Sequence, residues 1–170
     1  MASGDVHRRL GRILATIAVP SPLNMAALRA EVSRITGRPI AVREVDMPAG
    51  GPCGLWVSIG GTDVIYVAAR TSADHRRHVE LHEHGHILAG HDAVPVPHAD
   101  VSALVPDLDP ALVQRMLART SFSNQAEYEA ELLATMIECA GTEWASEPRR
   151  AVPDAAADVL GRIDHDLSQW

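Results

Sequence analysis

Residues 82–86 read His82-Glu83-His84-Gly85-His86, and this pentapeptide indicates both the fold and the chemistry of the chain. Residues four apart on a helix lie on one face, with Cβ atoms about 5–6 Å apart, so His82 and His86 can bind one metal ion. Glu83 follows the first histidine and can act as general base toward water. The pattern is typical of zinc hydrolases and predicts Zn²⁺ as the cofactor, with Glu83 as the catalytic residue.

The remaining histidines of this helix fall on two sides of it. His75 and His78 lie one and two turns before the predicted ligands on the same face. We expect them to line a cleft or to pack, and either could donate a hydrogen bond to a substrate oxyanion. His84 points to the opposite side, and the pattern predicts that it is solvated.

A catalytic zinc ion usually has three protein ligands, so a third donor is needed. In the stretch 124–140, Glu127, Glu131 and Glu138 fall on one helical stripe. We favour Glu127 as the third ligand. Glu131 is the alternative, either as the ligand itself or as the hydrogen-bond partner of a ligand imidazole.

A second possibility is a ligand directly after the helix, as in the metzincin pattern H-E-x-x-H-x-x-G-x-x-H. That pattern requires glycine at 89 and a ligand at 92, where this chain has Ala89 and Asp92. Gly90 and His91 are displaced by one residue, which turns a helix by about 100°. Asp92 is the best ligand under this hypothesis, and His91 is interpreted as a polar helix-end residue.

The composition predicts one soluble domain. Of the 170 residues, 46% are hydrophobic and 22% are charged, and the net charge is −7 without a basic stripe. We therefore expect no direct binding of nucleic acid. Cys53 and Cys139 lack CxxC spacing and are interpreted as reduced thiols. The apolar stretch 13–19 follows helical spacing, and no segment is long enough to span a membrane, so a cytoplasmic location is expected.

The apolar pattern predicts an α+β fold. We expect a small antiparallel or mixed three-stranded sheet packed with five to six helices. One of these helices carries the metal ligands, as the active-site helix of a zincin does. Strands are predicted at 40–45, 55–59 and 64–68, and helices at 4–18, 22–36, 74–89, 110–120, 124–140 and 154–168. We divide the single domain 1–170 into N-terminal helices (1–37), a zincin core (38–140) and a C-terminal helix (141–170).

With these motifs in hand, the chain resembles the ImmA/IrrE family of metallopeptidases. Members carry an HExxH helix, often HExGH, followed by a helix of the form E-x-x-A-x-x-F-A. The second motif here is Glu127-Tyr128-Glu129-Ala130-Glu131-Leu132-Leu133-Ala134, with Leu133 in place of the aromatic residue. The resemblance covers roughly residues 40–140. It is closest to short actinobacterial members in which the sequence found here at 51–56 precedes the third strand.

The resemblance implies a gluzincin-like fold with zinc held by His82, His86 and Glu127. The spacing to the downstream glutamate is longer than in many relatives, which leaves Glu131 open as the ligand. The resemblance also implies a protein partner, because family members commonly cleave or otherwise inactivate a helix-turn-helix repressor. Such proteins are often described as regulators or toxin components.

Two other functions remain open. The chain could be a metal-binding regulator or toxin component that acts by binding its partner without proteolysis, or a toxin whose target is not a peptide bond. If the protein is a peptidase, an extended substrate must cross the cleft. Strand 64–68 could be the sheet edge that pairs with this substrate, and its Tyr66 is a possible substrate contact. Tyr128, His78 and His75 are the candidates for an oxyanion donor.

Overall fold

The computed structural model describes residues 3–47, 52–93 and 123–142. It contains helices α1 (Ser3–Leu14), α2 (Met25–Thr36), α3 (Ala73–Ala89) and α5 (Asn124–Gly141), and strands β1 (Ile40–Val45), β2 (Gly54–Ile59) and β3 (Thr62–Ala68). The predicted α+β class with a small mixed sheet is confirmed. The described residues form four helices, and the helices predicted at 110–120 and 154–168 lie outside them.

The three strands form a mixed sheet in the order β1-β3-β2. Strands β2 and β3 are joined at a tight turn, where Gly60 and Gly61 have φ values of 55° and 85°, the positive values that a two-residue hairpin turn requires. Strand β1 pairs in parallel with the other side of β3. The expectation that 64–68 is the sheet edge is therefore wrong, because β3 is central and β2 is an edge strand.

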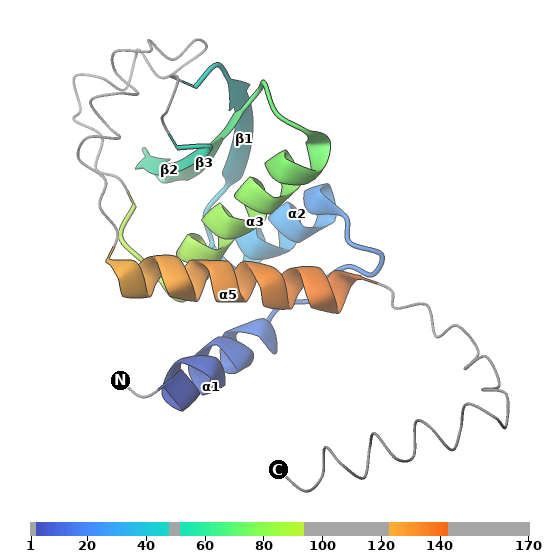
Figure 1. The fold of residues 1–170 in the computed structure, drawn as a ribbon, viewed down its shortest axis with the longest axis vertical. Helices are drawn as coiled ribbons and strands as arrows, with labels where there is room; N and C mark the ends of the chain where they lie inside the picture. Colours follow the sequence, from blue (N-terminus) through green and yellow to red (C-terminus); the bar gives the residue numbers. More distant parts are fainter. Residues whose placement is uncertain (1–2, 48–51, 94–122, 143–170) are drawn as a thin grey trace, which may run out of the picture.

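Helix α3 lies between the sheet and α5, and α1 packs on the far side of α5 (Figure 1). The alternation of side chains along β3 turns Ile65 and Val67 toward the helices. They join Leu81 of α3 and Leu133 of α5 in one buried cluster. Helix α3 is thus covered on several sides, which fixes its position against both the sheet and α5.

Polar side chains set the ends of the helices. Helix α2 begins at Met25, later than predicted, because Asn24 caps it by accepting a hydrogen bond from Ala27 N (2.9 Å). Helix α3 begins after Ser72, whose hydroxyl accepts from His75 N (3.2 Å). Helix α1 ends at Leu14, four residues earlier than predicted.

His84 is buried, which contradicts the prediction that it is solvated. Its exposed fraction is 0%, and its Nε2 lies 3.5 Å from Glu80 Oε1. The guanidinium of Arg29 in α2 donates to the same carboxylate. Because α2 covers the side of α3 that faces away from the predicted ligands, this side is not left to solvent.

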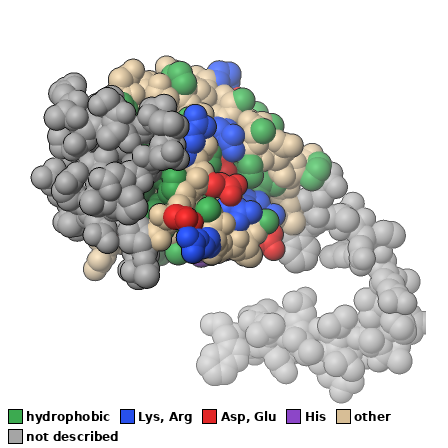
Figure 2. Space-filling view, turned by 90° about the horizontal axis from the view of Figure 1, so that it is seen from above, with side chains coloured by type: hydrophobic (Ala, Val, Ile, Leu, Met, Phe, Trp, Pro, Cys, Tyr) green, Lys and Arg blue, Asp and Glu red, His purple; other side chains and the backbone are tan. Residues whose placement is uncertain are grey.

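The surface drawn in Figure 2 carries arginine and acidic side chains next to one another, and neither kind forms a separate patch on that face. Among the described residues, no helix has the length and apolar character needed to cross a membrane.

Candidate metal centre

His82, His86 and Glu127 bring three ligand atoms to one point between α3 and α5. The Nε2 atoms of the two histidines are 3.0 Å apart. The carboxylate oxygens of Glu127 lie 3.3 Å from His82 Nε2 and 3.7 Å from His86 Nε2. All three donors lie within 4.8 Å of one another, so this group could hold a metal ion. The predicted ligands are therefore brought together as the helical spacing requires.

Glu131 lies on the other side of the His82 ring. Its Oε2 is 3.1 Å from His82 Nδ1, and its Oε1 is 3.2 Å from His78 Nε2. A histidine that binds a metal through Nε2 carries its proton on Nδ1, where a carboxylate can accept it. Glu127 thus lies with the two histidines in the group that could hold a metal ion, and Glu131 lies where it could accept a hydrogen bond from His82 Nδ1, the second role considered for it.

The two histidines differ in their surroundings. His86 is 1% exposed, whereas the side chain of His82 is 21% exposed. Burial, together with the neighbouring His82 and His91, lowers the pKa of His86 to about 3. His86 is therefore neutral at any pH near 7, as a metal ligand must be.

Glu83 is held in a dry position beside the three donors, with 7% of its surface exposed. Burial and, secondarily, the charge of Glu127 raise its pKa to about 8, while a hydrogen bond from the Trp56 backbone acts in the opposite direction. Gly54 of β2 leaves room for this carboxylate, since a Cβ there would lie 2.7 Å from Glu83 Oε1. Glu83 can therefore gain or lose a proton close to neutral pH.

The approach of α5 to α3 depends on Gly85. A Cβ atom at this position would lie 2.9 Å from the Ala130 Cα and even closer to the Ala130 carbonyl oxygen. Gly85 therefore permits a close contact between the two helices. This contact brings Glu127, three residues before Ala130, within reach of the histidines.

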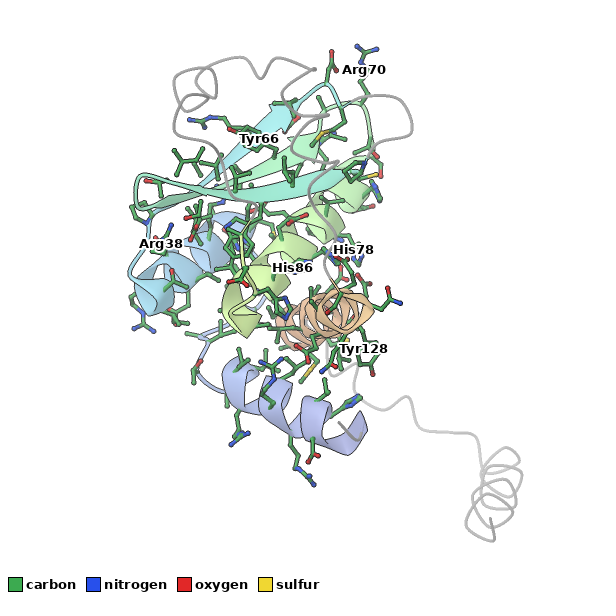
Figure 3. All side chains as sticks on the ribbon, turned by 90° about the vertical axis from the view of Figure 1, so that its left-hand side faces the viewer. Arg38, Tyr66, Arg70, His78, His86 and Tyr128 are labelled. Atoms are coloured by element: carbon green, nitrogen blue, oxygen red, sulfur yellow. The ribbon has the colours of Figure 1, made fainter. Side chains whose placement is uncertain are left out.

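The three donors and Glu83 open onto a cleft with a volume of about 430 Å³ between α3, α5 and the edge strand β2. Gly54, Leu55 and Trp56 of β2 form one wall, and His78 lies on another. Of the predicted oxyanion donors, His78 thus lines the cleft. Figure 3 shows His78 and His86 together on the side of the sheet where α3 and α5 lie.

The other predicted contacts lie elsewhere. His75 is exposed in the first turn of α3, and Tyr128 is 48% exposed; neither is among the described residues that line the cleft. Tyr66 is on the opposite face of the sheet, packed with Leu55 and Val57 (Figure 3). The structure therefore separates Tyr66 from the metal centre. Asp92 is not part of the donor group.

A second chain of polar contacts reaches His86 from outside the cleft. His86 Nδ1 lies 2.9 Å from His91 Nδ1, and His91 Nε2 lies 3.1 Å from Glu129 Oε2. Arg9 of α1 forms an ion pair with the same carboxylate. Burial acts to raise the pKa of Glu129, but hydrogen bonds from Gln125 and His91 and the charge of Arg9 hold it below its ordinary value.

The role of His91 was missed in the sequence, although a signal for it was present. Gly90 adopts a left-handed conformation (φ 73°) and ends α3. The backbone N–H of Gly90 donates to Ile87 O and that of His91 donates to His86 O, which defines a Schellman motif. In this motif the side chain of the residue after the glycine, here His91, contacts a residue of the last helical turn, here His86. The four-residue spacing from His86 to Gly90 therefore predicts the contact between the two imidazoles.

Comparisons of the chain with protein-family models, with curated proteins and with solved structures give no match.

Proposed function

We propose that the protein is a zinc-dependent endopeptidase. The observation that carries the proposal is the convergence of His82, His86 and Glu127 beside the buried Glu83. Two nitrogen donors and one carboxylate are a frequent ligand set of catalytic zinc, which leaves a fourth position open. Ligand atoms of a tetrahedral zinc ion lie about 3.3 Å apart. The two Nε2 atoms are 3.0 Å apart, and Glu127 places Oε2 3.3 Å from that of His82 and Oε1 3.7 Å from that of His86, so its carboxylate lies within reach of an ion shared with both histidines.

Zinc bound at this point would supply the Lewis acidity that polarises a carbonyl group and lowers the pKa of water. Glu83 acts as the general base, and its carboxylate takes a proton from the attacking water molecule. Its raised pKa, about 8, falls when a cation lies nearby, which brings it into the range where a general base works at neutral pH. The Trp56 backbone N–H holds the carboxylate in place, and Glu83 can then pass the proton to the leaving amine.

An extended peptide fits the wall formed by β2. Cys53 O accepts a hydrogen bond from Ala68 N (2.9 Å), so the odd-numbered residues of β2 exchange hydrogen bonds with β3. The backbone groups of Gly54 and Trp56 then face away from β3, toward the cleft. Apart from the Trp56 N–H, which donates to Glu83, a substrate strand could use these groups at the edge of the sheet, in place of the role first considered for strand 64–68.

The partner follows from the resemblance to the ImmA/IrrE family rather than from the fold. Members of that family act on helix-turn-helix regulators, and the same substrate class is proposed for this chain, as a repressor or an antitoxin. The genomic neighbourhood tests this part of the proposal. A neighbouring reading frame that encodes a helix-turn-helix protein would support it and would identify the candidate substrate.

Substitution of Glu83 separates proteolysis from binding alone. Glu83→Gln keeps the three metal donors and removes the general base, so it should retain zinc and lose cleavage of the co-expressed partner. Glu127→Ala should lose both. If Glu83→Gln relieves repression in cells as well as the parent protein does, the protein acts by sequestration and the peptidase proposal is wrong.

A further inference from the structure

We propose that His91 is a positioning residue for the metal ligand His86, held in turn by Glu129 and Arg9. The inference rests on the proposed metal site and extends it. It assigns the chain of contacts from His86 to α1 a function in metal binding, namely to fix the orientation of the one ligand that is fully buried.

The backbone places His91 for this role. The Schellman motif at Gly90 turns the chain back so that His91 N donates to His86 O (3.1 Å). The residue at this position usually makes an apolar contact with the preceding turn. Here the contact joins two imidazoles, with ring centroids 5.0 Å apart and planes at 66°. Two independent contacts, one backbone and one side chain, thus hold the same pair of residues together.

The direction of the hydrogen bonds follows from the chemistry of the rings. When Nε2 of His86 binds a cation, its proton must be on Nδ1. Nδ1 of His91 then accepts a hydrogen bond from this N–H group, and His91 carries its own proton on Nε2. That Nε2–H donates a hydrogen bond to Glu129 Oε2, 3.1 Å away. One set of tautomers therefore satisfies both the contact of His86 with His91 and that of His91 with Glu129.

Glu129 is the last residue in this series of contacts, and its carboxylate is held in place by several partners. Its side chain is 6% exposed, and that of His91 is 12% exposed. Gln125 donates to Glu129 Oε1 (3.0 Å), and Arg9 pairs with Oε2 while also donating to Ala89 O (3.3 Å). His82 has a simpler arrangement, since Glu131 contacts its Nδ1 directly and is half-exposed. The two ligands are thus oriented by different means.

The test compares His91→Phe with His91→Asn. Phenylalanine fills the space without an acceptor, whereas asparagine keeps an oxygen near the position of Nδ1 but cannot reach Glu129. Zinc affinity is measured by competition with a chelator, without any substrate. We expect His91→Phe to weaken zinc binding about 10–100-fold and His91→Asn to weaken it less. If the zinc affinities follow this pattern but the parent protein shows no proteolysis, only the proposed function is contradicted and the role of His91 stands.

A nitrogen-15 spectrum of the zinc-loaded protein supplies a second readout, which a merely structural role of His91 would not change. The Nδ1–H signal of His86 should shift in His91→Phe and remain near its original position in His91→Asn, while the signal of His82 serves as an internal reference. Zinc affinity of His91→Phe within twofold of the parent protein would overturn the proposal. If His91→Phe does not fold, His91→Leu, which also lacks an acceptor, takes its place, and zinc affinity of His91→Leu within twofold of the parent protein would overturn the proposal.

Discussion

Glu83 shows how a single buried acid can lower the stability of its own fold. The carboxyl group is buried beside another acid, Glu127, and its pKa of about 8 lies far above the ordinary value of 4.5. Between these two values, the Glu83 carboxyl group holds a proton in the folded protein without metal and has lost it in the unfolded chain. The contribution of Glu83 to stability therefore falls as the pH rises through this interval.

This linkage predicts the behaviour of Glu83→Gln without metal. In the presence of a chelator, the stability of the parent protein relative to the variant, which has no ionisable group at this position, should therefore fall between about pH 4.5 and pH 8. At pH 8 the variant should be more stable by roughly 2–4 kcal/mol, as measured by unfolding in urea. Parallel pH profiles of the two proteins would contradict the assigned environment of Glu83.

At the scale of the elements, the contact between α3 and α5 depends on the missing side chain of Gly85. The neighbouring atoms belong to the backbone of Ala130, so they cannot move aside as a flexible side chain could. Gly85→Ala should therefore cost about 1–3 kcal/mol of stability and weaken zinc binding, because it pushes Glu127 away from the histidines. Urea unfolding and chelator competition measure the two effects.

Gly11 provides the matched control for this substitution. It also lies inside a helix, α1, but a Cβ there would meet nothing within 4 Å. Gly11→Ala should stabilise the protein by roughly 0.5–1 kcal/mol through the lower entropy of the unfolded chain and leave zinc affinity unchanged. Equal effects of the two substitutions would mean that close packing at Gly85 is not needed.

Local spacing predicted the parts of the site that belong to one helix or to one stripe. The separation of His82 from His86 predicted that the two imidazoles lie together, and the stripe through Glu127 and Glu131 predicted the two carboxylates that lie beside them. Spacing could not predict the burial of His84, because that depends on α2, which comes from a distant part of the sequence. The central place of β3 likewise depends on its parallel pairing with β1, a long-range contact.

At the scale of the whole molecule, a metal ion would connect two helices that are separated in the sequence. If zinc binds as proposed, it requires the folded arrangement of α3 and α5, so it should raise the free energy of unfolding by about 2.7 kcal/mol at a free concentration 100 times its dissociation constant. A thermal unfolding experiment with and without zinc measures this effect.

Three variants locate the source of this stabilisation. His82→Ala and Glu127→Ala should abolish the effect of zinc, whereas Glu131→Ala should only reduce it, because Glu131 contacts His82 Nδ1 and not the metal position. The opposite order of Glu127→Ala and Glu131→Ala would make Glu131 the third ligand.

Arg9 connects the N-terminal helix to the rest of the molecule. Its guanidinium reaches both Ala89 O at the end of α3 and the carboxylate of Glu129 in α5, so three helices meet at one side chain. Arg9→Gln removes the charge that faces a carboxylate of 6% exposure, and it should destabilise the protein by about 1–3 kcal/mol. Arg8 pairs with Asp5 on the exposed side of the same helix, where its own side chain is 76% exposed, so Arg8→Gln should change stability by less than about 0.5 kcal/mol. Urea unfolding of the two variants compares them directly.

Because the Arg9 contact ends on the residue that holds His91, Arg9→Gln should also weaken zinc binding severalfold, while Arg8→Gln should not. Equal zinc affinities of the two variants would show that α1 supports the fold without influencing the metal centre.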